Sequence, residues 1–128
     1  MNTTLARILV VDDDKVMLTF VMNSLRRLGI QEIESAHDGV SALKAMMAFK
    51  PNLVLTDIHM QPLNGLELVQ QLRSHSNPFV KNMKVIFMSA DARSATLQGA
   101  LPLSTYGYII KPPRLDTLQA KIEWALKK

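Results

Sequence analysis

The side chains of this sequence that could do chemistry together each directly follow a short apolar run. They are Asp12, Asp13 and Asp14 after the first run, Asp57 after the third, Ser89 after the fourth and Lys111 after the fifth. Carboxylates a few ångströms apart repel by about 4 kcal/mol per pair at an effective dielectric constant of roughly 20, so an acidic cluster favours a bound cation. Because only oxygen donors are on offer, the expected ion is Mg²⁺, which prefers one or two carboxylates, several waters and a phosphate oxygen.

Phosphoryl transfer is the chemistry that suits this set of side chains. An aspartate carboxylate can act as the nucleophile, and the protein then mostly positions groups and neutralises charge on the transferred oxygens. We therefore expect Asp57 to be the nucleophile, with Mg²⁺ and Lys111 supplying positive charge. The Ser89 hydroxyl is expected to donate a hydrogen bond.

Five short apolar runs alternate along the chain with five amphipathic segments. The runs predict strands over residues 7–11, 32–36, 53–57, 85–88 and 108–110. Apolar residues at three- and four-residue steps predict helices over residues 15–28, 38–49, 66–73, 92–101 and 115–126. Since parallel strands need crossover connections, this alternation indicates an α/β fold with helices on both faces of a parallel sheet.

The expected architecture is a flavodoxin-like, doubly wound (βα)5 sandwich of three layers, with five parallel strands in the order 2-1-3-4-5. In such sheets, ligands bind beyond the carboxyl ends of the strands, near the point where the strand order reverses. The candidate side chains follow strand ends, so we expect them to converge on one site.

Length and composition describe one ordinary folded domain, residues 1–128. The 128 residues are 48% hydrophobic and 20% charged, which excludes a disordered tail. The lack of cysteine excludes disulfides and thiolate chemistry. The net charge of +4 comes from basic residues spread along the chain, so no direct nucleic-acid binding is expected. The N-terminal apolar run stops at Asp12, too soon for a signal peptide or membrane span, so we expect a cytoplasmic protein without membrane insertion.

Four motifs at the strand ends carry a family resemblance. They are Val10-Val11-Asp12-Asp13, Thr56-Asp57-Ile58-His59-Met60, Met88-Ser89-Ala90 and Tyr108-Ile109-Ile110-Lys111-Pro112. Each motif alone is weak, but four in the right order, each at a strand end, are specific. Together they resemble the response-regulator receiver domains of two-component signalling, and the resemblance covers essentially the whole chain.

The resemblance implies a phosphorylation site with a metal beside it. Asp57 would be the phosphorylated residue. Asp13 and Asp57 would bind the metal directly, Asp12 would act through water, and the backbone carbonyl of His59 would be a further ligand.

The resemblance also implies a conformational switch. Ser89 and Lys111 would hold the phosphoryl group, the Ser89 hydroxyl would move toward it, and Tyr108 would turn inward into the vacated space. The Lys111-Pro112 peptide bond would be cis, which proline makes less costly.

In this interpretation the chain is not an enzyme that turns over a substrate, but a phosphoacceptor with slow self-dephosphorylation. The donor would be a sensor histidine kinase or a histidine phosphotransfer protein. Because no output domain follows Lys128, the signal is expected to leave through a downstream protein target or self-association.

Two other functions fit parts of the sequence. Residues 12–16 also fit the Asp-x-Asp-x-Val pattern of haloacid-dehalogenase-like phosphohydrolases, with Asp12 as nucleophile and Asp14 as acid/base. Against this, the chain is short for that family and has no acidic pair after Lys111, and Asp14 could simply cap the first helix. The third interpretation is a phosphorylation-independent binding module, which the complete set of pocket side chains disfavours.

Two surfaces are candidates for partner binding. A helical projection places Leu18 and Met22 off the expected core stripe of the first helix, where a phosphodonor would face them in the family. That stripe comprises Met17, Phe20, Val21, Leu25 and Leu28. In the last helix, Trp124 lies nearly opposite the apolar stripe and, with Lys121, is expected to belong to an output or self-association surface.

A histidine stands close to the proposed nucleophile. His59 follows Asp57 by two residues, and no second histidine stands at metal-ligand spacing from it. We expect its side chain at the pocket rim, where it would affect how water reaches the phosphoryl group.

Overall fold

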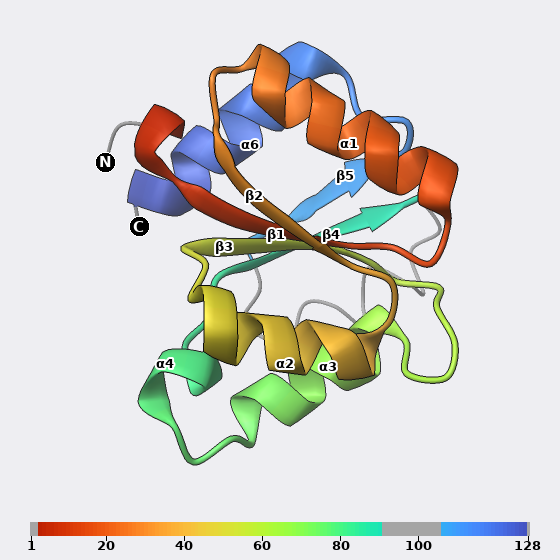
Figure 1. Ribbon diagram of the computed structural model, residues 1–128, viewed down its shortest axis with the longest axis vertical. Coiled ribbons are helices and arrows are strands. Elements are labelled where there is room, and N and C mark those ends of the chain that lie inside the picture. The colour runs from red at the N-terminus through yellow and green to blue at the C-terminus, as the bar shows by residue number, and fades with distance from the viewer. Residues whose placement is uncertain (1–2, 91–105, 128) are drawn as a thin grey trace.

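The computed structural model describes residues 3–90 and 106–127. Its strands are β1 (Arg7–Val11), β2 (Glu32–Ala36), β3 (Leu53–Asp57), β4 (Val85–Ser89) and β5 (Tyr108–Ile110). All pair in parallel, in the order β2-β1-β3-β4-β5 (Figure 1). The predicted α/β fold and strand order are therefore confirmed.

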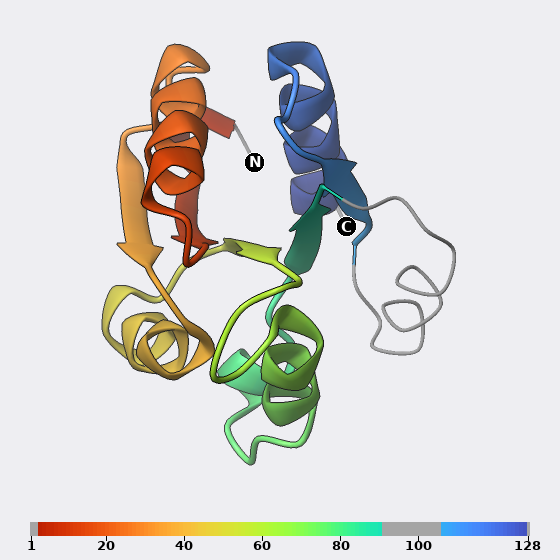
Figure 2. The same ribbon diagram turned by 90° about the vertical axis from the view of Figure 1, so that its right-hand side faces the viewer.

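Helices cover both faces of the sheet. They are α1 (Lys15–Arg27), α2 (Gly39–Phe49), α3 (Gly65–Arg73), α4 (Pro78–Lys81) and α6 (Leu115–Lys127), preceded by a 3₁₀ turn, η1 (Thr3–Leu5). Figure 2 shows α1 and α6 on one side of the sheet, and α2, α3 and α4 on the other. This is the expected three-layer arrangement.

The sheet separates two apolar cores. β3 and β4 are buried along their whole length, because both of their faces are covered by helices. Val54 and Phe87 pack with α2 and α3 in one core, whereas Leu55 and Ile86 pack with α1 and α6 in the other. Successive side chains along one strand point to opposite faces, so a single strand contributes alternate residues to the two cores.

Helix ends follow local sequence signals. The carboxylate of Asp14 accepts hydrogen bonds from the Val16 and Met17 amides, at 2.9 and 3.3 Å, and caps α1. Gly29 lies just beyond the end of that helix with a φ of 89°, a conformation that glycine adopts without strain. The capping role considered for Asp14 is confirmed.

The structure corrects one prediction for the first helix. Phe20 was expected in the core but is 44% exposed, since the buried face of α1 runs through Val21, Ser24 and Leu25. That face accepts a serine because the Ser24 hydroxyl donates to the Phe20 carbonyl at 2.9 Å.

The short helix α4 was not predicted. The helix predicted over residues 92–101 lies outside the described residues.

No helix in the described part of the chain is long and apolar enough to cross a membrane.

Candidate functional site

The candidate site lies where parallel strands end at one edge of the sheet. Val11 of β1 pairs with Thr56 of β3, so the next residues, Asp12 and Asp57, stand side by side. On the other side of β3, Asp57 pairs with Met88. The Lys111 amide donates to the Ser89 carbonyl at 2.8 Å, so β5 ends at the same edge.

Three carboxylates converge there. One carboxylate oxygen from each of Asp12, Asp13 and Asp57 lies within 4.8 Å of the others. Asp12 is fully buried, Asp57 is 5% exposed and Asp13 faces solvent. The site thus has two buried carboxylates, those of Asp12 and Asp57, and one at its solvent-exposed entrance, that of Asp13.

Lys111 places a positive charge beside the two buried carboxylates. Its Nζ atom lies 2.8 Å from Asp12 Oδ2 and 3.2 Å from Asp57 Oδ1. The three side chains are at most 10% exposed, so solvent screens these pairs little. The ammonium therefore binds two carboxylates that would otherwise repel each other at close range.

Burial and charge act in opposite directions on these groups. Burial is the main influence on Asp57 and raises its pKa, and the negative charge of Asp12 raises it further. The positive charge of Lys111 and the hydrogen bond from the His59 backbone amide act in the opposite direction and lower it. Burial alone would lower the pKa of Lys111, but its hydrogen bond to Asp12 and the two carboxylate charges raise it overall. Additional positive charge beside Asp57 would therefore favour its ionised form.

The geometry suits a small, hard cation. Ligand oxygens on opposite sides of an octahedral Mg²⁺ are about 4 Å apart, because each bond is about 2.1 Å. Neighbouring ligand oxygens of such an ion are about 3 Å apart, so the carboxylate oxygens of the acidic cluster, which lie within 4.8 Å of one another, would move closer around a bound ion or reach it through water. Asp12, Asp13 and Asp57 could therefore hold a small divalent cation.

The two carboxylates of the phosphohydrolase interpretation are already engaged. Asp12 accepts from the Asp14 amide through Oδ1, at 2.9 Å, and from Lys111 through Oδ2. Asp14 caps α1 and faces solvent, so it does not point at Asp12 as an acid/base partner would. This arrangement does not favour the alternative.

The predicted switch residues flank the acidic site. Ser89 ends β4 and is 1% exposed. Tyr108 begins β5, pairs with Phe87 and packs, half-buried, against the core that includes α2 and α3. The Lys111-Pro112 peptide bond is cis, as the resemblance implied, and so is Gln61-Pro62.

His59 lies at the rim of the site, as the sequence suggested. It is exposed and lines a hollow of about 330 Å³ together with Asp13, Met60, Gln61 and Asn64. This hollow opens beside the acidic cluster and is large enough for several water molecules.

Sequence reasoning missed one positioning residue, Gly65. Its amide donates to the Ile58 carbonyl at 2.8 Å. A Cβ atom on Gly65 would lie 2.2 Å from the Asp57 backbone oxygen and 3.0 Å from Ile58 Cα. Only glycine lets α3 approach the Asp57 loop this closely, and the spacing of Asp57 and Gly65 alone could not reveal that contact.

Known proteins share this sequence pattern. A profile described as the response regulator receiver domain matches residues 8–123. Chemotaxis protein CheY1 of Helicobacter pylori is 35% identical over 121 residues, which cover 94% of this chain and 96% of that protein. The chain belongs to the response regulator receiver domain family.

Solved receiver domains share its fold. A signal receiver domain of a response regulator from Bermanella marisrubri is 32% identical, with a TM-score of 0.83, and the match covers 94% of this chain and 97% of that one. The receiver domain of a sensor histidine kinase from Pseudomonas aeruginosa PAO1 is 22% identical, with a TM-score of 0.85 over 97% of this chain and 99% of that one. That protein was solved with a magnesium ion coordinated in its active site cleft.

The residues predicted to bind partners lie outside the acidic site of this receiver domain. Leu18 and Met22 are half-buried against the core that includes α1 and line a hollow between α1 and β2. Trp124 is 49% exposed, and its ring meets Tyr106 edge to face at 5.7 Å. Lys121 lines another hollow, beside β5.

Replacing Gly65 by alanine is expected to destabilise the receiver domain by about 2–4 kcal/mol, because the added methyl group meets backbone atoms that cannot move separately. Urea unfolding measures this loss. Gln70→Ala, on an exposed position of the same helix, should change stability by no more than about 0.5 kcal/mol. Equal stabilities of Gly65→Ala and the parent would show that α3 can move away without cost.

Proposed function

We propose that this receiver domain accepts a phosphoryl group on Asp57 from a phosphohistidine donor and thereby switches a protein-binding surface. The observation that carries the proposal is the contact of one ammonium, Lys111 Nζ, with both Asp12 and Asp57 at the carboxyl edge of the sheet. Family membership supports the assignment.

The chemistry is a transfer between two protein side chains. An Asp57 carboxylate oxygen attacks phosphorus, the phosphorus–nitrogen bond to the donor imidazole breaks, and the ring nitrogen keeps the bonding electron pair. Lys111 stays beside Asp57 and neutralises charge on the transferred oxygens. The Ser89 hydroxyl lies at the end of the neighbouring strand and would donate to a phosphoryl oxygen.

A magnesium ion is the proposed cofactor. Asp13 and Asp57 would bind it directly, Asp12 through water, and the His59 backbone carbonyl would complete the protein ligands. Bound Mg²⁺ supplies charge neutralisation for the incoming phosphoryl group. The related receiver domain solved with magnesium in its cleft supports this choice of ion.

Phosphorylation is proposed to act through β5. The Ser89 hydroxyl would move toward the phosphoryl oxygens, and Tyr108, half-buried at the start of that strand, would turn inward. The partners are a sensor histidine kinase or phosphotransfer protein in the cytoplasm and a downstream protein or second copy of the chain. Residues 1–128 would act as one phosphoacceptor unit whose acyl phosphate hydrolyses slowly.

Incubation with Mg²⁺ and acetyl phosphate tests the proposal directly. Mass spectrometry after peptide digestion should find one added phosphoryl group, located on Asp57, and chelation of Mg²⁺ should prevent its addition. A phosphoryl group on Asp12 would instead support the phosphohydrolase alternative. A protein that stays unmodified would support the phosphorylation-independent binding module.

His59 is expected to slow attack of water on the phosphorylated Asp57. Replacing it by the smaller asparagine should shorten the phosphoryl lifetime about threefold, because the hollow beside Asp13 becomes more open to water. Phosphate release after removal of the donor gives the lifetime. The matched control is His37→Asn, on an exposed histidine outside that hollow. Identical lifetimes for His59→Asn and the parent would remove this role.

Two surfaces are proposed to serve different partners. The phosphodonor would pack on α1 against Leu18 and Met22, which line the hollow between α1 and β2. Trp124, with Lys121, would contact the output partner or a second copy. The first surface adjoins the acidic site through the N-terminus of α1, whereas the second lies on α6.

Paired variants separate these surfaces. Leu18→Ala should slow phosphorylation by a protein donor about fivefold and leave the rate with acetyl phosphate unchanged, since only the protein donor needs the helix contact. Trp124→Ala should leave both rates unchanged but weaken partner binding or self-association about tenfold. Equal effects of the two variants in both assays would contradict the assignment.

A further inference from the structure

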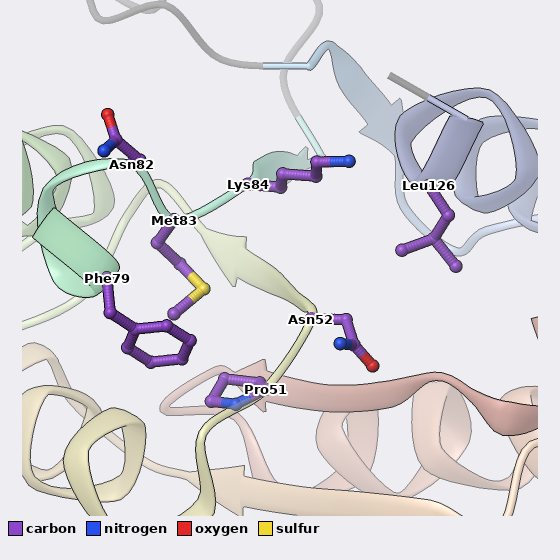
Figure 3. A pocket seen from close by; sticks show the side chains of 7 residues that line it. All are labelled: Pro51, Asn52, Phe79, Asn82, Met83, Lys84 and Leu126. Carbon is purple, nitrogen blue, oxygen red and sulfur yellow. The ribbon is translucent and has the colours of Figure 1, made fainter. Parts of the chain in front are cut away.

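A further hollow lies at the opposite end of the sheet from Asp57. It measures about 300 Å³ and opens where β3 and β4 begin and α6 ends (Figure 3). Its lining residues are Pro51, Asn52, Phe79, Asn82, Met83, Lys84 and Leu126. Nothing in the proposed phosphoryl chemistry uses any of them.

The lining is apolar on two sides. Pro51 and Met83 are buried, and Figure 3 shows them beside the Phe79 ring, with Leu126 across the opening. Phe79 is 42% exposed although it belongs to the short helix α4 next to a core residue, Val80. A hollow of this size and lining can take one large apolar side chain and bury part of the exposed Phe79 ring.

Among the described residues that line the hollow, the one charged side chain is that of Lys84. Lys84 lines it, and its Nζ atom donates to the Ala125 carbonyl at 2.9 Å and lies 5.5 Å from the Tyr106 ring centre. Both partners are uncharged, so they do not cancel the lysine charge. Exposed lysines also adjoin lining residues in the sequence, and these are Lys50, Lys81 and Lys127.

The carboxylate nearest to Leu126 along α6 is that of Glu123, which accepts a hydrogen bond from Gln119 at 3.2 Å and does not line the hollow. None of the described lining residues is a carboxylate. Glu32, which begins β2 at this end of the sheet, is paired with Arg7 at 3.5 Å. The acidic site and the basic hollow therefore occupy opposite ends of the strands, and an anionic ligand would be steered to the hollow.

The distance between the two ends lets both be used at once. Asn52 precedes β3 and Asp57 ends it, so the two are five residue steps of extended chain apart, or about 17 Å. A ligand in the hollow would not block a donor at Asp57.

The geometry points to a binding site for an acidic segment of a partner protein that inserts one large apolar side chain between Phe79, Met83 and Leu126. The carboxylates of the segment would face the lysines of the rim. A nucleic acid strand fits less well, because such strands are held by several stacking aromatic rings and Phe79 is the single aromatic residue of the lining.

Nuclear magnetic resonance of the ¹⁵N-labelled full chain tests the site. The probe is a nine-residue peptide of glutamate and serine with one central phenylalanine. We expect it to shift the amide signals of residues 79–84 and 126, with a Kd on the order of 0.1–1 mM that weakens as salt increases. The same peptide with alanine in place of phenylalanine should bind about tenfold more weakly.

Variants on the rim show whether charge and shape both contribute. Lys81→Glu should weaken binding of the probe about fivefold and Phe79→Ser about tenfold. Both positions are exposed, so the fold should survive, and the amide spectrum of each variant checks this. Lys44→Glu makes the same charge change on the exposed face of α2 and should stay within about twofold of the parent.

Three results would overturn the inference: no shifts in the hollow at millimolar peptide, equal binding of a lysine-based peptide, or tighter binding of an oligonucleotide. The site is independent of phosphorylation. The peptide should bind an Asp57→Asn protein with unchanged affinity, so failure of the proposed phosphoryl transfer and failure of this site are separate results.

Discussion

Replacing Asp57 by asparagine is expected to lower phosphoryl incorporation from acetyl phosphate by at least about 100-fold, because a carboxamide cannot act as the nucleophile. The change removes one charged oxygen at the end of β3 and keeps the size of the side chain. Mass spectrometry of the intact protein, incubated with Mg²⁺ and acetyl phosphate, measures the loss.

The same variant should be more stable than the parent protein without Mg²⁺. Burial raises the pKa of Asp57, which means that folding disfavours the charged form of this side chain. The neutral amide avoids that cost, so the free energy of unfolding near neutral pH should rise by about 1 kcal/mol. Urea unfolding with and without Mg²⁺ should show this gain shrinking as the ion stabilises the parent protein.

Asp14→Asn is the matched control for both measurements. Asparagine caps helices about as well as aspartate, so the hydrogen bonds from Val16 and Met17 can be kept. Its phosphoryl incorporation and stability should match those of the parent. Incorporation that survives in Asp57→Asn but is lost in Asp14→Asn would place the nucleophile in the acidic stretch after β1.

Replacing Lys111 by methionine is expected to destabilise the receiver domain strongly in the absence of Mg²⁺. It removes the ammonium that lies 2.8 and 3.2 Å from Asp12 and Asp57 and leaves two buried carboxylates without a counter-charge. Breaking one side of a buried ion pair typically costs about 3–5 kcal/mol, so a loss of about 3 kcal/mol is expected at about pH 8 without Mg²⁺. Urea unfolding of the variant and the parent gives the difference.

The loss should depend on pH in a defined direction. Without the ammonium, the folded-state pKa of Asp57 rises further above its unfolded value, so the folded protein binds a proton more tightly than the unfolded chain does. The stability difference between Lys111→Met and the parent should therefore grow as pH rises through that folded-state pKa and shrink as pH falls. Mg²⁺ should also reduce it, since the ion supplies positive charge to the same carboxylates.

An exposed lysine provides the control for Lys111. Lys44→Met removes the same charge from the solvent-facing side of α2 and should change stability by no more than about 0.5 kcal/mol at any pH tested. If the Lys111→Met and Lys44→Met proteins unfold alike, the ion pairs at the carboxyl edge do not stabilise the fold.

The strands and most of the helices were predictable because short stretches of sequence show the apolar patterns typical of each. A buried parallel strand must be apolar throughout, so β1, β3 and β4 stand out in the sequence as continuous apolar runs. The side chains of capping residues such as Asp14 and Asn64 accept hydrogen bonds from backbone amides two or three residues later, so the start of a helix can also be predicted from a short stretch of sequence. The helix α4 escaped notice because four residues are too few for a helical period.

The position of the candidate site followed from topology once the strands were known. Parallel strands bring their carboxyl ends to one edge, so Asp12, Asp57 and Lys111 had to lie near one another. The sequence could not give the 2.8 and 3.2 Å contacts of the ammonium with Asp12 and Asp57. Those depend on side-chain directions, which the strand pattern leaves open.

Local patterns were enough to predict the five strands, their order in the sheet and the edge at which the acidic groups meet. Packing between elements settled which faces became buried, so Phe20 is exposed where periodicity placed it in the core. It also decided why residue 65 must be glycine and where Phe79, Met83 and Leu126 form a hollow. The physical reason is that periodicity records contacts within one element, whereas these features arise between elements distant in the chain.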